Sequence, residues 1–106
     1  MELLTPELRA GLPKLYAQEK NKDPIVHVKF FTPDSSWTWF ITEGQAEEDD
    51  FIFFGYVIGQ TREWGYISLN ELSSVHGPYG LPIERDLHFQ PGPMSEVLKR
   101  EGHEQG

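Results

Sequence analysis

The stretch DSSWTWFITEGQAEEDDFIFFGYVIG, residues 34–59, holds the pattern that decides the fold. Two runs rich in aromatic and β-branched residues, 37–43 and 51–59, flank the polar run 44–50. Such side chains favour strands, so we predict two strands joined by a loop over the polar run. Large apolar side chains occur on both faces of each expected strand. Because an antiparallel sheet usually leaves one face in water, the second face must be covered by helices or by a partner.

Similar runs on either side extend the predicted sheet. Residues 25–31 and 63–69 are each rich in β-branched and aromatic residues, and we predict a strand over each of them. In the first of these strands, Val26 and Val28 are expected to share a face, because side chains alternate along a strand. The four strands follow one another through short connections, which is typical of an antiparallel meander.

Helix signals occur near the N-terminus and after the fourth expected strand. Thr5 is followed by a proline, a pair that suits the cap and the first position of a helix. A second short helix is expected around 14–18. Ser68 and Glu71 match a capping box, which predicts a helix over 69–75.

The remaining segments complete an α+β arrangement. Residues 84–89 resemble a fifth short strand, and residues 91–102 predict one or two helical turns before a frayed tail over 102–106. We therefore predict a single domain over 1–106 of class α+β. It comprises an antiparallel β-meander of four to five strands, with short helices at the N-terminus, after strand four and at the C-terminus.

Composition excludes several classes of function. The chain of 106 residues has 17 acidic residues against 9 basic ones, a formal net charge of −8. Proteins that track nucleic-acid phosphates or dock on anionic membranes need a basic surface. We therefore expect no direct nucleic-acid binding and no membrane binding, and a basic protein as the fitting partner. The chain has no cysteine and no long apolar run, so we expect a soluble, cytoplasmic protein.

An acidic run between the second and third strands is one candidate functional feature. It has two interpretations. The charge can discourage edge-to-edge pairing of neighbouring sticky strands, or it can engage a basic groove of a partner and raise the association rate. A calcium loop is not expected, because EGQAEEDD lacks the alternating ligands and central glycine of such loops.

Aromatic side chains beside the acidic run are the second candidate feature. Most are expected to pack in the core, but an exposed Trp or Tyr is the kind of residue that dominates protein interfaces. Together with the acids they make up a predicted partner-binding surface. It comprises Glu43, Glu47, Glu48, Asp49, Asp50, Trp37, Trp39 and Tyr56.

Enzymatic and metal-binding arrangements have weaker support. His27, Asp86 and His88 have the ligand chemistry of a zinc site, but their spacing matches no metal motif. No serine lies in a nucleophile-elbow pattern, and no glycine-rich phosphate loop occurs. We expect no cofactor and no catalytic residue, and we keep a metal-binding or hydrolytic accessory enzyme using these three residues as an alternative.

The segments LLTPELRAGLPKLYAQE, DPIVHVKFFTPDSSWTWFITEG, DFIFFGYVIG, GYISLNEL and GLPIERDLHFQP together resemble a family of small bacterial proteins. The family is domain of unknown function 2958, and the resemblance covers about 3–97. It implies a cytoplasmic protein encoded by plasmids or other mobile DNA, often near anti-restriction or DNA-processing genes. The resemblance carries over no activity and no catalytic residue.

These observations favour a small, acidic, non-enzymatic protein-binding module encoded by mobile DNA. One form of this hypothesis is an anti-defence inhibitor of a host defence or DNA-processing protein. Besides the metal-binding alternative, a homodimeric structural subunit that hides its second apolar sheet face in a dimer is also consistent with the sequence.

Overall fold

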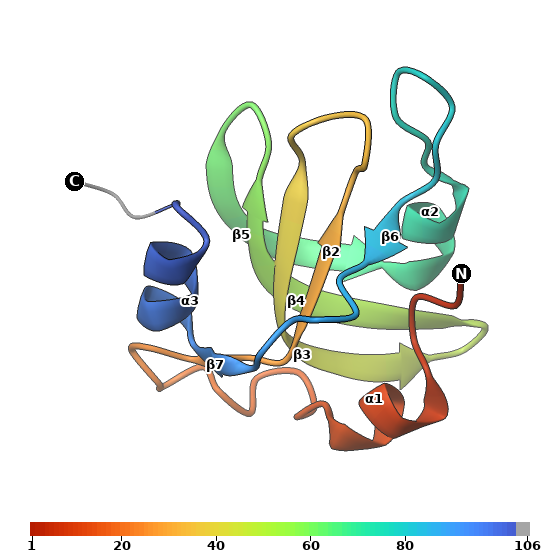
Figure 1. Ribbon diagram of the computed structural model, residues 1–106. Coiled ribbons are helices and arrows are strands. Elements are labelled where there is room, and N and C mark those ends of the chain that lie inside the picture. The colour runs from red at the N-terminus through yellow and green to blue at the C-terminus, as the bar shows by residue number, and fades with distance from the viewer. Residues whose placement is uncertain (104–106) are drawn as a thin grey trace.

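The structure is a computed structural model, and it describes residues 1–103 (Figure 1). Within these residues, three short helices and seven strands follow one another. In order, they are α1 (Pro6–Gly11), β1 (Ile25–Val26), β2 (Val28–Phe31), β3 (Thr38–Glu47), β4 (Asp50–Ile58), β5 (Arg62–Ser68), α2 (Leu69–Ser74), β6 (Glu84–Arg85), β7 (Gly92–Pro93) and α3 (Met94–Arg100).

The predicted α+β class is confirmed. Five antiparallel strands form one sheet in the order β5-β4-β3-β2-β6, and β1 pairs with β7 in a separate two-stranded sheet. Strands β2 to β5 are a meander, because each pairs with the next along the chain. The helices follow the N-terminus, β5 and β7, and the capping signals predict the first two of them. Thr5 caps α1, and Ser68 caps α2 through the backbone N–H of Glu71.

The first face of the sheet packs against α1 and α2. Its core includes Phe30, Ile41 and Phe53, which are fully buried, and the rings of Phe30 and Phe53 meet edge to face at 5.4 Å. Leu12 after α1 and Leu72 of α2 belong to the same cluster. Burial of these side chains removes apolar surface from water, which is the main stabilising contribution to the fold.

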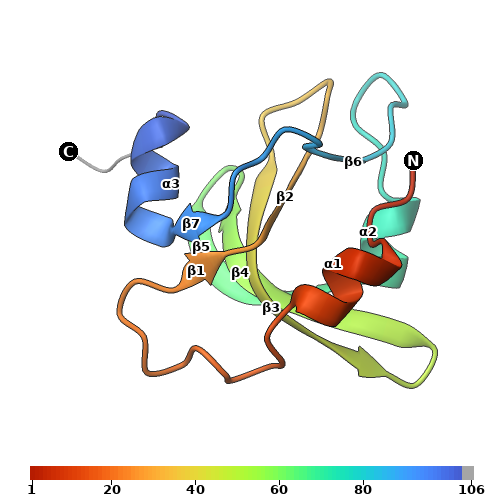
Figure 2. The same ribbon diagram turned by 60° about the horizontal axis from the view of Figure 1, so that its bottom comes forward.

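The second face packs against α3. Phe40 and Ile58 of the sheet form a smaller cluster with Met94 and Val97 of the helix. Figure 2 shows α1 and α2 on one side of the sheet and α3 on the other. The expectation that helices cover the second apolar face is therefore confirmed for its centre. The outer part of β4 and β5 lies beyond α3, and Trp64 and Tyr66 remain exposed there.

The prediction of a loop over 44–50 is wrong. Strand β3 continues to Glu47 and β4 begins at Asp50, and the two pair as one hairpin. The glycine of this segment does not start a turn. Gly44 lies inside β3, and glycine fits there because a Cβ would be 2.4 Å from the ring of Phe51. Only two residues form the turn, and Glu48 at its tip has φ +53.

Three other expectations need correction. Residues 14–18 form hydrogen-bonded turns, not a helix. Val26 and Val28 lie in different core clusters, because the expected first strand breaks into β1 and β2 between them. The expected strand over 84–89 is only two residues long.

The start of the predicted frayed tail is also packed. The N–H of His103 donates to the carbonyl of Leu98 at 2.7 Å, and its ring lies 5.9 Å from that of Phe40. Residues 104–106 of the predicted tail lie outside the described residues. In the part that is described, no helix has both the length and the apolar character needed to cross a membrane.

Candidate functional site

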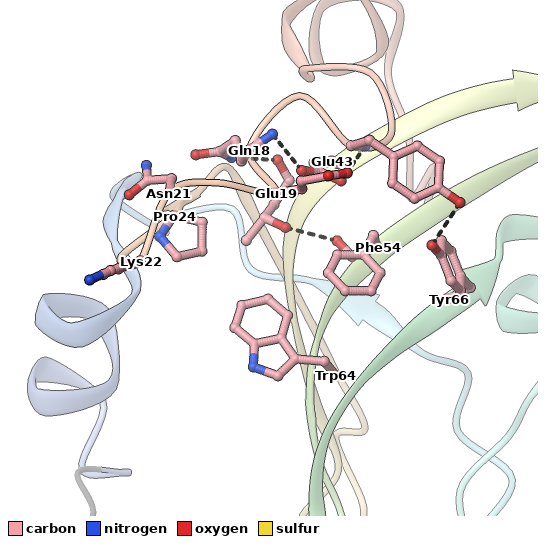
Figure 3. Close-up of a pocket in the computed structure, with 11 residues that line it drawn as sticks. Gln18, Glu19, Asn21, Lys22, Pro24, Glu43, Phe54, Trp64 and Tyr66 are labelled. Carbon is pink, nitrogen blue, oxygen red and sulfur yellow. Dashed lines mark hydrogen bonds between the residues drawn. The ribbon is translucent and has the colours of Figure 1, made fainter.

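A pocket of about 360 Å³ opens between the turn segment 14–24 and the outer part of the second sheet face (Figure 3). One wall is aromatic and comes from β4 and β5; the other is polar and comes from the turn segment and β3. The pocket is lined by Tyr16, Gln18, Glu19, Asn21, Lys22, Pro24, Thr42, Glu43, Phe54, Trp64 and Tyr66.

The aromatic wall follows from the pairing of β4 with β5. Phe54 lies opposite Tyr66 in the ladder, and Tyr56 lies opposite Trp64, so all four rings project from one face. The ring of Phe54 stacks on Trp64 with centroids 5.5 Å apart and planes 15° apart, and it contacts Tyr66 at 5.0 Å. Trp64 and Tyr66 are nevertheless 43% and 56% exposed. Their rings therefore offer open faces to a ligand.

Glu43 of β3 builds the polar wall. Its side chain is buried, with 4% of its surface exposed. One carboxylate oxygen accepts the N–H of Tyr16 at 2.9 Å, and the other accepts the N–H of Gln18 at 2.7 Å. These two bonds join the turn segment to β3.

Tyr16 joins the two walls. Its backbone has φ +72, a left-handed conformation that is rare for a bulky side chain and costs about 1–3 kcal/mol. This conformation directs the ring toward β5, where the hydroxyls of Tyr16 and Tyr66 are 3.0 Å apart (Figure 3). The hydrogen bond to Tyr16 is the main cause that raises the pKa of Tyr66 above its ordinary value. Strained residues of this kind often mark functional sites.

Gln18 fixes the far end of the turn segment. Its side-chain amide accepts the N–H of Ile25 at 2.7 Å and donates to the carbonyls of Ile25 and Thr42 at 3.0 and 2.9 Å. The amide thus satisfies both backbone hydrogen-bonding groups of Ile25 in β1, as a neighbouring strand would. Because every bond ends on the main chain, the turn segment is held against the sheet at a defined distance.

Two carboxylates line the pocket, those of Glu43 and Glu19. Their charges add, after the hydrogen bond to Tyr16, to the rise in the pKa of the Tyr66 phenol. Lys22 also lines the pocket, but Figure 3 shows its ammonium pointing away from the rings. Aromatic faces attract cations through the ring quadrupole, and nearby carboxylates add to that attraction. The pocket is therefore suited to a positively charged group.

The predicted partner-binding residues lie in three separate places. Glu47, Glu48 and Asp49 are exposed at the tip of the β3–β4 hairpin, which projects from the body of the molecule in Figure 1. Glu43 was predicted as part of the same acidic loop, but it lies in strand β3 and is buried in the pocket wall. We call the three exposed acids the acidic tip.

Asp50, the fourth acid of the run, holds α2 in place. Its carboxylate accepts the hydroxyl of Ser68 and the N–H of Asn70, the latter at 3.0 Å. The hydrogen bond from Ser68 is the main cause that lowers the pKa of Asp50 below its ordinary value. Asp50 therefore links the hairpin to the start of a helix, an arrangement that favours negative charge.

The predicted aromatic residues also lie in two separate places. Trp37 and Trp39 lie 6.0 Å apart, and Trp37 covers Gly59 so closely that a Cβ there would be 2.6 Å from the ring. Tyr56 belongs to the opposite face, where its ring contacts Trp64 at 5.3 Å. Only Tyr56 is thus near the pocket, and it does not line it.

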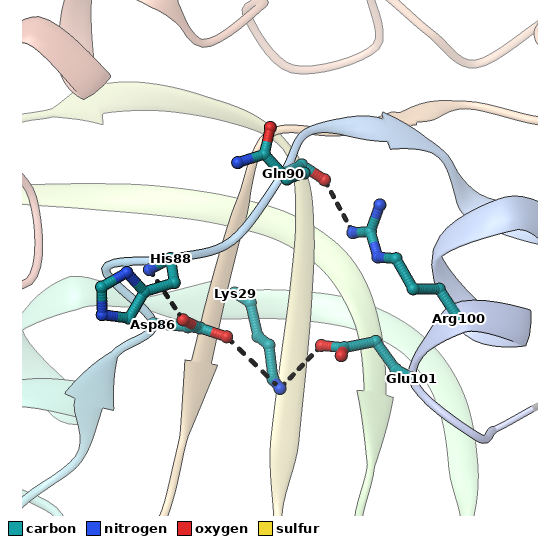
Figure 4. A network of polar contacts seen from close by, with 6 residues as sticks. All are labelled: Lys29, Asp86, His88, Gln90, Arg100 and Glu101. Carbon is teal, nitrogen blue, oxygen red and sulfur yellow. Dashed lines mark hydrogen bonds and ion pairs between the residues drawn. The ribbon is translucent and has the colours of Figure 1, made fainter.

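His27, Asp86 and His88 do not form a metal centre. The Asp86 carboxylate accepts the backbone N–H of His88 at 2.9 Å and lies 3.6 Å from the Lys29 ammonium, which Glu101 contacts at 2.7 Å (Figure 4). Burial lowers the pKa of His27. Among residues 1–103, no group of three or more His, Asp or Glu side chains could hold a metal ion.

Sequence reasoning missed most of the pocket. The sequence predicts a helix around 14–18, which includes Tyr16 and Gln18, and it predicts that most of the sheet aromatics pack in the core without saying which stay exposed. One signal was available for three of these aromatics. Phe54, Trp64 and Tyr66 lie on a sheet face whose small terminal helix cannot cover four strands, so some of the rings had to stay exposed.

The family comparison gives one match. A family model described as "Protein of unknown function (DUF2958)" matches residues 3–105. The chain matches no curated protein and no solved structure.

Proposed function

The chain belongs to the DUF2958 family, and from its aromatic pocket we propose that it is a non-enzymatic binding module for a basic protein partner. A lysine or arginine side chain of the partner enters the pocket between the turn segment and the β4–β5 rings. The proposal retains the predicted partner chemistry and moves the predicted site from the acidic loop to this pocket.

One observation carries the proposal: open faces of Trp64 and Tyr66 lie beside two carboxylates in one concave site. A flexible, hydrated cation gains the most binding free energy where aromatic rings replace part of its water shell and carboxylates balance its charge. The backbone strain at Tyr16 supports a binding role, because the structure holds this residue in place without any gain to the core.

The cellular role in this proposal comes from the resemblance to mobile-element proteins. A cytoplasmic module encoded by mobile DNA, which binds a host defence or DNA-processing protein through its basic surface, would act as an inhibitor. Nucleic-acid-binding proteins carry such basic surfaces, and the net charge of −8 favours their approach.

The test is a titration of the protein with acetyl-arginine methylamide, followed through the backbone amide signals of the residues that line the pocket. We expect saturable, weak binding, and no binding of the matched citrulline compound, which has nearly the same shape without the charge. The Trp64→Ala variant is expected to weaken binding about 3- to 30-fold, since a cation–π contact contributes about 0.5–2 kcal/mol.

Trp37→Ala is the matched control for this experiment. Trp37 and Trp64 are 40% and 43% exposed, and only Trp64 lines the pocket. Equal weakening by both variants, or equal binding of the arginine and citrulline compounds, would contradict the proposal.

A further inference from the structure

We propose that the partner segment binds as an added strand along the free edge of β5, with alternate side chains entering hollows on the two faces of the sheet. This inference rests on the proposed function for the chemistry of one hollow and goes beyond it in naming the backbone conformation of the partner. Strand addition is a common way to recognise an extended peptide, because an exposed sheet edge offers unpaired N–H and C=O groups.

The two edges of the five-stranded sheet differ in how they are protected. At one edge, β6 has only two residues, and short edge strands are one way in which proteins prevent unwanted pairing. At the other, β5 has seven residues and pairs with β4 without a register shift over Arg62–Ser68. In the described part of the chain, no strand pairs with the outer side of β5.

The sequence of β5 leaves this edge open. REWGYIS contains neither proline nor lysine, the residues that most often blunt an edge strand, and no bulge interrupts it. The guanidinium of Arg62 is engaged with the carbonyl of His103, so the charge at the start of the strand is turned toward the chain's own C-terminal segment. The open part of the edge is therefore Glu63 to Ile67.

A hollow lies on each side of this edge. Trp64 and Tyr66 project into the aromatic pocket on one face. On the other face, a hollow of about 280 Å³ is bordered by β5 and α2. Its lining includes Val57, Ile67, Leu72, Val75, Glu63 and Glu71. Successive side chains of an added strand point to opposite faces, so neighbouring residues of one peptide would reach both hollows.

The chemistry of the two hollows defines the partner segment. The aromatic pocket suits a basic side chain. The second hollow combines aliphatic side chains with two carboxylates, Glu63 and Glu71, so it suits an aliphatic side chain with positive charge nearby. The partner segment is thus an extended stretch in which basic and aliphatic residues alternate. The net charge of −8 favours this occupant over a second copy of the chain and over a nucleic acid.

The experiment uses a capped seven-residue peptide of alternating valine and arginine. Two further peptides carry N-methyl groups, one on every valine nitrogen and one on every arginine nitrogen, so that each removes the N–H donors along one edge without changing the side chains. A fourth peptide has citrulline in place of arginine. Binding is measured by backbone amide chemical shifts of the full chain, with Trp64→Ala and Trp37→Ala as paired variants.

If the proposal is correct, the parent peptide shifts the amides of Glu63 to Ile67, and one of the N-methyl peptides binds at least about tenfold more weakly. The Trp64→Ala variant weakens binding and Trp37→Ala does not. Equal binding of the parent and both N-methyl peptides, with loss in Trp64→Ala, would overturn strand addition and leave the proposed function in place.

Four other results separate the remaining possibilities. Citrulline peptide binding as tightly as the parent, with sensitivity to N-methylation, supports strand addition and contradicts the preference for a basic side chain. Self-association through β5 without peptide binding overturns both strand addition and the proposed function. Binding of oligothymidine in place of the peptides also overturns both proposals. Absence of any binding at millimolar peptide also overturns both.

Discussion

Glu43 shows how burial changes the role of a charged residue. Within the acidic segment 43–50 it was expected to be solvated, yet it lies under the turn segment and accepts two backbone N–H groups. A carboxylate in such a place is stabilised by its donors, and the donors are satisfied only while the carboxylate is present. The position of Tyr16 in the pocket therefore depends on a residue that no ligand needs to touch.

Removing that carboxylate is predicted to loosen the pocket and destabilise the protein. Hydrogen bonds to charged groups contribute about 1.5–3 kcal/mol each, and single substitutions seldom cost more than about 4 kcal/mol. Glu43→Ala removes two such bonds and is therefore expected to lower the free energy of unfolding by about 3–4 kcal/mol. Glu43→Gln keeps one acceptor oxygen, so it is expected to lower the free energy of unfolding by about half as much. Chemical denaturation measures both.

Glu19→Ala is the control, because Glu19 also lines the pocket but is exposed. A surface substitution of this kind changes stability by about 0.5 kcal/mol or less. If Glu43→Ala were as mild as this control, the carboxylate would not hold the turn segment.

At the scale of elements, the strands and helix starts were predictable and the connections were not. The Thr5 and Ser68 caps and the alternation in β4 depend on neighbours in the chain, so local rules apply to them. The extent of the β3–β4 hairpin depends on Gly44, where a Cβ would meet the ring of Phe51 from the neighbouring strand β4. The turn segment depends on Glu43, far along the chain. Contacts of this kind leave no local pattern, which is why the pocket they form was not foreseen.

The link between the hairpin and α2 predicts a defined pH dependence. The pKa of Asp50 is below 3.8 in the folded protein, chiefly because of the hydroxyl of Ser68, and an unfolded chain has no such bond. A lowered pKa means that Asp50 contributes stability above about pH 3.8, and that this contribution is lost as the pH falls through the folded pKa. The stability difference between parent and Asp50→Asn is therefore expected to shrink in acid.

Thermal unfolding at a series of pH values measures this difference. Ser68→Ala is expected to cost about 1 kcal/mol at neutral pH through the loss of the N-cap, and in that background Asp50→Asn should have a smaller effect. Independent, additive effects of the two substitutions would show that the pair does not act as a unit.

At the scale of the whole molecule, the acidic tip is separated in space from the pocket in which a ligand is proposed to bind. The acidic tip lies about four strand residues beyond Glu43, a distance of about 13 Å. This is longer than the Debye length of about 8 Å at physiological salt. The tip therefore does not touch a group bound in the pocket, but it adds to the field that a basic partner meets during approach.

This separation predicts a kinetic effect of the tip. The triple variant Glu47→Lys, Glu48→Lys and Asp49→Lys is expected to slow association with the valine–arginine peptide and to flatten its salt dependence, while dissociation changes little. Asp50 is left unchanged, because it supports α2. Stopped-flow mixing at several salt concentrations measures both rates. A large rise in the dissociation rate would instead place the tip in direct contact with the peptide.

The side chain of Gln18 has a further consequence for motion. It bonds both the N–H and the carbonyl of Ile25, and the same amide reaches Thr42. When the turn segment lifts from the sheet, the Ile25 amide loses its acceptor at that moment. Deuterium uptake at this single amide therefore reports how often the pocket opens, and a bound ligand that holds the segment closed slows the uptake without touching Ile25.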